Sequence, residues 1–252
     1  MMNIDLHTHG KLSKKTEFSL DYFLSMVREA LENGLDAIAL TEHFNTLRFS
    51  DLLDRLDQNF EYIGDYYSVE GLKVFTGMEV DVKETGHILL VGNRAIIREL
   101  NDELEPYKEK GSFIPFERLL DRTDALPLLR IGAHPLRRST PLAHHPAELL
   151  KRLDGFDLNA KDLYEEGSGM AEKVNAFARE IGLPVFAGSD SHQPLQFGSV
   201  WNRLAASCET AEELRSRLLS GTHRVEISPC LPVKVKGAQM MKELLKQSMA
   251  AG

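Results

Sequence analysis

The 252-residue sequence is poor in cysteine and has no long apolar run. Its two cysteines, Cys208 and Cys230, form neither a disulfide framework nor a paired metal site, so we expect a reducing, cytoplasmic environment. No apolar stretch approaches the ~20 residues of a membrane span, and the first residues lack the basic and apolar regions of a signal peptide. We therefore predict neither a membrane segment nor a secretion signal.

Positive charge is also scarce, since 30 basic against 38 acidic residues give a formal net charge of −8. A general nucleic-acid-binding protein normally carries a basic face, so the sequence gives no strong nucleic-acid signal. The charge does not exclude a small anionic substrate, because bound metal ions would dominate the local field. No pattern specifies an oligomeric state.

The sequence is rich in a repeated unit, in which a short apolar run ends in a polar cluster and a helical segment follows. We predict strands over residues 4–6, 37–40, 73–78, 88–91, 128–132, 156–159, 184–188 and 225–227. We predict helices over 20–33, 50–67, 146–153, 170–181, 210–219 and 237–249. This alternation is typical of βαβ units and a parallel sheet. Six or seven units in one chain favour a closed or distorted α/β barrel, which we expect to form a single domain over residues 1–252.

Local signals support several of these helix boundaries. Ser19 can cap the first helix and Gly34 can end it, while Thr210 and Glu213 have the spacing of a capping box. The segment 237–249 is short and weakly apolar, so we expect it to pack on the body of the protein. The segments 44–60, 93–125 and 136–147 carry no recognisable motif and are candidate specificity loops.

Most histidines stand at or beside a predicted strand boundary, together with two carboxylates. These residues are His7, His9, His43, His87, His134, His192, Glu79 and Asp190. The carboxyl ends of barrel strands meet on one face, so we expect these side chains to lie together. Imidazole and carboxylate ligands suit Zn²⁺, Mn²⁺ or Fe²⁺. Glu79 can bridge two ions, and such a pair, sharing a hydroxide, can drive an in-line displacement at phosphorus.

Taken singly, these residues have ordinary interpretations. A lone His43 or His87 is more commonly a hydrogen-bonded structural residue, and a lone Asp190 is commonly a helix cap. The coincidence of all eight at corresponding points is what favours a metal centre. His144 and His145 lie between prolines without strand context, so we interpret them as exposed or at the edge of the substrate site, and His223 as structural.

The five motifs that contain these residues resemble those of the PHP (polymerase and histidinol phosphatase) domain family. They are Asp5-Leu6-His7-Thr8-His9, Thr41-Glu42-His43, Gly77-Met78-Glu79, Gly132-Ala133-His134-Pro135 and Gly188-Ser189-Asp190-Ser191-His192, in the family's order over about residues 1–200. The resemblance implies a distorted (β/α)7 TIM-like barrel with metals at the C-terminal strand ends.

The resemblance also implies a division of the ligands among two or three divalent ions. His7, His9, Glu79 and Asp190 would hold one ion. Glu79 would bridge to a second ion, held also by His134 and His87. His43 and His192 would hold a third, and Glu42 would orient a ligand rather than bind an ion.

The sequence departs from the family's pattern at Lys14 and Lys15, where a His or Asp for the third ion is usual. A protonated lysine cannot ligate a cation, so the third site is weak, completed by water, or absent. Either lysine, like Lys11, is instead a candidate contact to a substrate phosphate. Arg137 and Arg138 are further candidates, since arginine suits phosphate, and Asn159 ends a strand that can line the pocket.

We therefore predict a hydrolase that cleaves a phosphomonoester or phosphodiester of a small metabolite or nucleotide through a metal-activated hydroxide, with Asp190 and His192 also handling protons. One alternative is amidohydrolase-like attack on C–N or C–O bonds. Another is a non-catalytic metal-binding module associated with DNA replication or repair. A pocket without arginine or lysine near the metals would favour the amidohydrolase.

Overall fold

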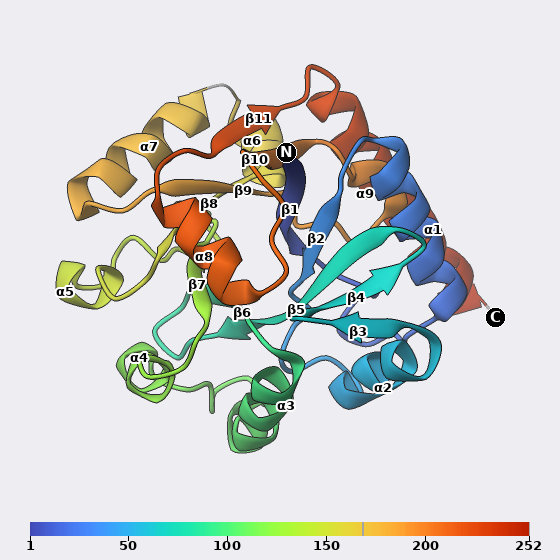
Figure 1. Ribbon diagram of the computed structural model, residues 1–252, viewed down its shortest axis with the longest axis horizontal. Coiled ribbons are helices and arrows are strands. Elements are labelled where there is room, and N and C mark those ends of the chain that lie inside the picture. The colour runs from blue at the N-terminus through green and yellow to red at the C-terminus, as the bar shows by residue number, and fades with distance from the viewer. Residues whose placement is uncertain (168, 252) are drawn as a thin grey trace.

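The computed structural model describes residues 1–167 and 169–251, and in these residues seven strands surround a common axis (Figure 1). In spatial order they are β1 (Met2–Thr8), β2 (Ala37–Leu40), β5 (Leu72–Asp81), β6 (His87–Val91), β7 (Leu129–Ala133), β8 (Gly155–Asn159) and β9 (Val185–Gly188). Strand β10 (Val200–Leu204) pairs antiparallel with β1, and β11 (Arg224–Ile227) pairs with β10.

The barrel closes differently at its two ends. At the carboxyl end of β1, the Asp190 amide donates to the His7 carbonyl at 2.8 Å and the His9 amide donates to the Ser191 carbonyl at 2.9 Å. At the other end Asn202 of β10 lies between β1 and β9, and its side-chain amide bonds the Ala187 N–H and carbonyl. The sheet is therefore nearly closed, which confirms the predicted distorted TIM-like barrel.

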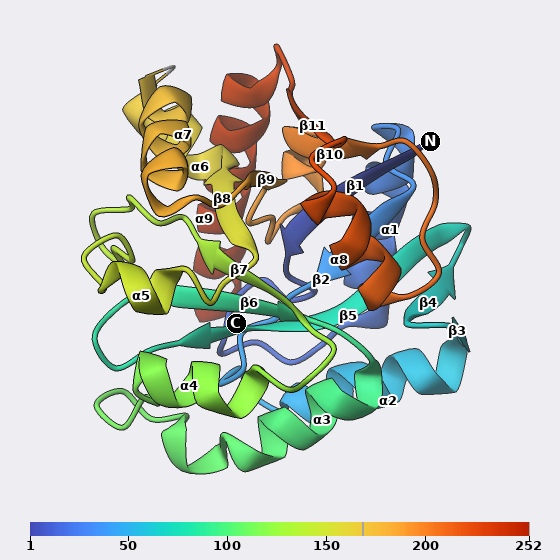
Figure 2. The same cartoon turned by 60° about the vertical axis from the view of Figure 1, so that its left-hand side comes forward.

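Helices cover the outside of the sheet (Figures 1 and 2). They are α1 (Leu20–Glu32), α2 (Phe49–Asn59), α3 (Arg94–Glu103), α4 (Phe116–Thr123), α5 (Ala147–Leu150), α6 (Ala160–Glu166), α7 (Gly169–Ile181), α8 (Ala211–Leu219) and α9 (Leu231–Ala251), with 3-10 turns η1 (Glu105–Tyr107) and η2 (Pro194–Gln196). Among the described residues, no helix is both long and apolar enough to cross a membrane.

Alternate residues of a strand point to opposite faces of the sheet, so the buried strand residues fall into two packing layers. In β2, Ala37 and Ala39 join one buried cluster, whereas Ile38 and Leu40 join the cluster that packs against the outer helices. Both sides of such strands are buried, so they appear in the sequence as continuous apolar runs. The Ser19 hydroxyl accepts a hydrogen bond from the Tyr22 amide at the start of α1, as the capping signal predicts.

Three sequence-based expectations about local structure were wrong. The helix predicted over 50–67 ends at Asn59, and the hairpin β3 (Glu61–Ile63) and β4 (Tyr66–Val69) follows, because its aromatic and β-branched residues favour a strand paired with β5. The sheet is not all parallel, since the short connection from β5 to β6 permits an antiparallel pair, and β6 pairs antiparallel with β7. The segment 93–125 contains α3 and α4 rather than a loop.

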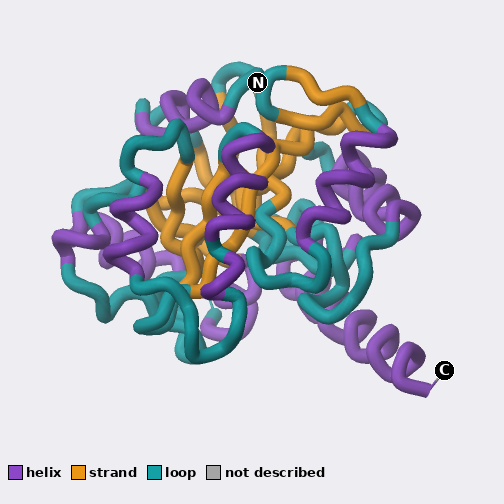
Figure 3. Tube along the Cα trace, turned by 90° about the horizontal axis from the view of Figure 1, so that it is seen from below, coloured by secondary structure: helices purple, strands orange, loops and turns teal. Residues whose placement is uncertain are grey.

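Helix α9 is longer than the predicted 237–249. It begins at Leu231, and Leu231, Val235 and Ala238 form a buried stripe against the body. Its carboxyl-terminal part extends away from the rest of the protein (Figure 3). Within the predicted segment 237–249, Ala238 is buried, whereas Met240, Met241 and Leu244 are exposed.

Candidate metal centre

The eight predicted metal ligands lie at one end of the barrel. His7 and His9 come from the end of β1, and the others lie at the matching ends of β2, β5, β6, β7 and β9. His134 and Asp190 have φ angles of 34° and 59°, in the left-handed region that residues other than glycine rarely adopt. Backbone strain of this kind costs on the order of 1–3 kcal/mol per residue and is concentrated at functional sites.

Donor atoms of these side chains converge in three overlapping groups, within each of which they lie within 4.8 Å of one another. The groups are His7, His9 and Glu79; Glu79, His87 and His134; and His9, His43 and His192. Glu79 Oε1 lies 3.7 Å from His7 Nε2 and 3.3 Å from His134 Nε2, while Oε2 lies 3.6 Å from His9 Nε2. Asp190 Oδ1 lies 3.2 Å from His9 Nε2. Glu79 therefore has the central position expected of a bridging carboxylate.

Several buried polar atoms in this cluster lack a hydrogen-bond partner among the described residues. They include Glu79 Oε2, His9 Nδ1, His43 Nδ1 and His134 Nδ1. His43 Nδ1 lies 2.7 Å from Glu79 Oε2, yet the two atoms are not aligned as a hydrogen bond. Buried polar atoms are normally paired, and divalent ions held by this donor set would satisfy some of them. The residues present thus fit a metal centre.

The electrostatics of the cluster favour the metal-binding form of Glu79 and His134. Burial by itself would raise the pKa of Glu79, but His43, His87 and His134 outweigh burial and hold it well below its usual range. Burial, reinforced by Arg137, lowers the pKa of His134 to about 3, so its imidazole is neutral near pH 7. An ionised carboxylate beside a neutral imidazole is the form in which both side chains bind metal. At His7, His9 and His87, burial opposes protonation, but nearby carboxylates outweigh it and raise the pKa values, so a bound cation would have to displace a proton from these three rings.

Two buried carboxylates that the sequence analysis missed support His7. Asp157 Oδ2 accepts a hydrogen bond from His7 Nδ1 at 2.8 Å, which fixes the tautomer and leaves Nε2 directed at the cluster. Asp5 accepts hydrogen bonds from the backbone amides of His7 and Ser189, and burial raises its pKa to about 7. The signal that could have found Asp157 is its position two residues before Asn159, which places both side chains on the same side of β8.

Glu42 and Gly188 shape the surroundings of the cluster. Glu42 accepts hydrogen bonds from the backbone amides of Gly10 and His43, and its Oε1 lies 3.7 Å from His9 Nδ1. This agrees with the orienting role expected of it. A Cβ at Gly188 would lie 2.5 Å from the Cβ of His7, so only glycine permits β9 to approach β1 so closely.

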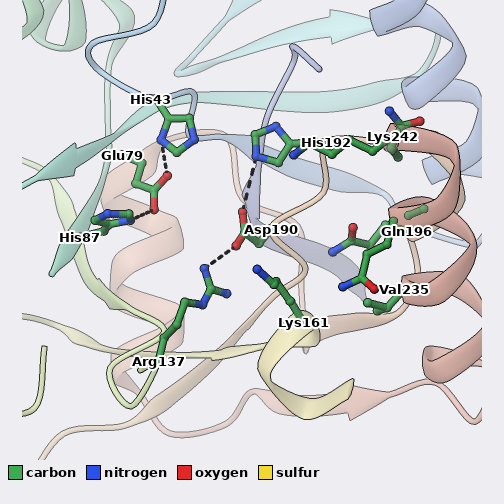
Figure 4. A pocket seen from close by; sticks show the side chains of 13 residues that line it. His43, Glu79, His87, Arg137, Lys161, Asp190, His192, Gln196, Val235 and Lys242 are labelled. Carbon is green, nitrogen blue, oxygen red and sulfur yellow. Dashed lines mark hydrogen bonds and ion pairs between the residues drawn. The ribbon is translucent and has the colours of Figure 1, made fainter. Parts of the chain in front are cut away.

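A cavity of about 270 Å³ opens in front of the cluster (Figure 4). We call His43, Glu79, His87, Asp190 and His192 the histidine wall of this cavity, and Arg137, Lys161 and Lys242 its cationic wall. Gln193, Gln196 and residues Val235, Ala238 and Gln239 of α9 complete the lining. No sequence motif marks Lys161, Lys242 or the glutamines, so these lining residues were not predicted.

The substrate-binding candidates differ in where they lie. Arg137 is in the cavity, where Nη1 lies 2.9 Å from Asp190 Oδ2 and Nε lies 2.8 Å from Asp162 Oδ1. Lys14 reaches the edge of the site and pairs with Asp81 Oδ2 at 2.8 Å, while the other oxygen of Asp81 lies 3.0 Å from His87 Nε2. Lys14 thus acts on a neighbour of the ligands rather than lining the cavity.

The other candidates do not line this cavity. The Arg138 side chain is 86% exposed and pairs with Glu166. Lys15 is exposed, and the buried Lys11 ammonium donates to the Leu47 carbonyl. Asn159 is buried because it caps α6 and donates to Asp157 at 3.1 Å, so its expected place in the pocket lining was wrong.

The remaining histidines have structural contacts. His144 and His145 donate to the carbonyls of Glu84 and Thr85. His144 is exposed, as expected, whereas His145 is buried. His223 bonds the carbonyls of Leu218 and Val185, as a structural histidine would.

Comparison with known proteins places this geometry in a family. Over 97% of the chain, the fold matches the crystal structure of PsfC from Pseudomonas syringae PB-5123, with a TM-score of 0.81, 20% identity and 98% of that chain covered. It also matches the lesion-specific endonuclease PfuEndoQ from Pyrococcus furiosus over 89% of the chain, with a TM-score of 0.69 and 22% identity. An Endonuclease Q complex with a 27-mer duplex carrying an abasic lesion matches over 90%, with a TM-score of 0.66 and 21% identity.

Because each sequence identity is low, these likenesses establish the fold and nothing more. The chain spans somewhat more than half of the two endonuclease chains, 57% and 58%. No curated protein sequence matches the chain significantly. The sequence profile of the PHP domain matches residues 5–167, and that of the PHP-associated region matches residues 171–223. The chain therefore belongs to the PHP domain family.

Proposed function

We propose that this chain is a metal-dependent phosphoesterase acting on a phosphate ester of a small metabolite or nucleotide. The observation that carries the proposal is the placement of Arg137 beside a carboxylate-centred group of histidines, on one cavity. When bound, divalent ions would neutralise phosphate oxygens and lower the pKa of water that attacks phosphorus. We propose two or three ions, of zinc, manganese or iron, held by the eight ligands described above.

The chain's own residues would orient the phosphate and control protons. Arg137 Nη2 is buried without a hydrogen-bond partner among the described residues, so it can donate to a phosphate oxygen. Burial by itself would raise the pKa of Asp190, but His7 and Arg137 hold it well below its usual range, so Asp190 stays ionised. His192 donates from Nδ1 to the Lys11 carbonyl at 2.9 Å, which leaves its Nε2 lone pair available. Asp190 and His192 would therefore serve as ligands or proton acceptors.

The cationic wall supports this function over the alternatives. An amidohydrolase acting on an uncharged C–N bond has no need of an arginine and two lysines at its metal centre. A replication or repair module would bind nucleic acid, for which the net charge of −8 is unfavourable. The phosphoesterase is the hypothesis that uses both walls of the cavity.

The test is an assay of purified protein loaded with Mn²⁺ on p-nitrophenyl phosphate, bis(p-nitrophenyl) phosphate, histidinol phosphate and nucleotide esters. We expect turnover of at least one phosphate ester. Arg137→Ala should lower kcat/KM by about 100-fold or more, whereas the matched control Arg138→Ala should leave it unchanged. If the protein retains its metal and cleaves none of these esters, the proposal is wrong.

A further inference from the structure

Helix α9 brings a lysine to the metal-facing cavity from outside the segments that the family profiles match. Those profiles end at residue 223, whereas Val235, Ala238, Gln239 and Lys242 of α9 line the cavity. The buried stripe of α9 and its contact with η2 and α6 hold this helix in place. Figure 4 shows Lys242 of α9 and Lys161 of α6 on the cavity, with Asp190 and His192.

The three cations of the wall are not equivalent. The Arg137 guanidinium is already paired with Asp162 and Asp190. The Lys161 ammonium lies 3.8 Å from its carboxylate partner Glu165, in a pair that is largely exposed to solvent. Within the described part of the chain, Lys242 enters no ion pair with a carboxylate. Lys242 therefore supplies positive charge that no described carboxylate neutralises, and Lys161 is held only by a long, half-exposed ion pair.

Desolvation makes this arrangement costly in the absence of an anion. Lys242 is only partly exposed, and burial lowers its pKa to about 8, although Asp190 works in the opposite direction. An unpaired, partly buried cation is unfavourable unless a ligand supplies the opposite charge. The cavity of about 270 Å³ is also smaller than the ~300–1,000 Å³ of sites for drug-sized ligands, which favours a compact ligand.

We propose that Lys242 and Lys161 form a subsite for a second anionic group, so that the substrate is a compact phosphate ester with a nearby carboxylate. Arg137 and the metal ligands would receive the phosphate, and the two lysines would receive the carboxylate. This inference rests on the proposed function and specifies its substrate class. Lys242 would be a specificity-determining residue that the PHP segment itself does not contain.

Direct binding tests the subsite without requiring turnover. Phosphonoacetate and isobutylphosphonate are similar in size, but only phosphonoacetate carries a carboxylate, and neither has an ester bond to cleave. Calorimetric titration of the metal-loaded protein should show about tenfold tighter binding of phosphonoacetate. Lys242→Ala and Lys161→Ala should each reduce that preference severalfold, and Lys242→Arg should keep most of it.

Lys236→Ala is the matched control, because Lys236 is an exposed lysine of the same helix that does not line the cavity. It should leave the preference unchanged, and metal content should be equal in all variants. Equal binding of both phosphonates by the unmodified protein would overturn the subsite but leave the phosphoesterase proposal intact. Binding of neither phosphonate would count against both. A preference that survives Lys242→Ala and Lys161→Ala would remove the lysines from the assignment.

Discussion

The histidine wall and the cationic wall face the same cavity but come from different kinds of structural element. The histidine wall consists of residues at or just beyond strand ends, which the barrel brings together. The cationic wall comes from the loop after β7 and from helices α6 and α9. The first is marked in the sequence by repeated motifs, whereas the second has none.

This difference has a physical basis. Metal ligation requires particular atoms at short distances, so the residue types and their spacing are restricted. A cation that attracts a substrate group acts over a longer range and can be supplied by any flexible lysine within reach. Under the proposals made above, the strand ends would carry the chemistry and the surrounding helices would carry the specificity.

The largest effect should come from the centre of the histidine wall. Glu79→Gln keeps the size of the side chain but removes the charge shared by two of the three donor groups. Since a metal centre contributes several kcal/mol to catalysis, we expect kcat to fall about 1,000-fold or more, with loss of bound metal. Activity assays and metal analysis measure both effects. Glu148→Gln, at an exposed position, is the control, and full activity in Glu79→Gln would refute the central role of this carboxylate.

Metal removal should destabilise the histidine wall as a whole. At free metal about 1,000 times the Kd, binding adds about 4 kcal/mol to the free energy of unfolding. For a protein of this size, the melting temperature should therefore fall by about 8–16 °C when a chelator is added. Calorimetry before and after adding excess Mn²⁺ checks reversibility. The same melting temperature with and without metal would contradict a folded-state metal centre.

The orienting contact behind the histidine wall should have a smaller effect. Asp157→Asn keeps a hydrogen-bonding group beside His7 but removes the charge that holds its tautomer. Changes of this kind typically cost about 10- to 100-fold in metal affinity or activity. Metal titration of the variant measures the loss, with Asp102→Asn on the exposed face of α3 as the control. Unchanged affinity would mean that Asp157 serves packing alone.

The smallest expected effect is on the pH dependence of stability, through Asp162, which pairs with Arg137 of the cationic wall. Burial raises the pKa of Asp162 from 3.8 to about 6, although Arg137 opposes the shift. The folded protein then binds more protons at Asp162 than the unfolded chain between these pH values, so this group's contribution to stability falls as pH rises from about 4 to about 6. Asp162→Asn should remove on the order of 1–2 kcal/mol from that pH dependence. Urea unfolding of both metal-free proteins at pH 4.5 and 6.5 measures it, and parallel pH profiles would contradict the assignment.

Much of the fold was predictable because its signals are local. The first helix begins at Leu20 after its Ser19 cap, and α8 ends at Leu219, as predicted. The hairpin after Asn59 and the helices α3 and α4 could not be predicted. Short segments of mixed pattern take their structure from the sheet or core that they join. The antiparallel pairing of β6 likewise depends on its neighbours.

The sequence by itself determined the residue types at the strand ends and hence the family and the expected chemistry. Only the tertiary structure decided which arginine faces the cavity, that Asp157 supports His7, and that α9 contributes Lys242. The physical reason is the distance along the sequence between the residues that determine each feature. A strand end with its ligand is specified by a few adjacent residues, whereas the partner of a side chain more than a hundred residues away is fixed by the summed packing of the whole barrel.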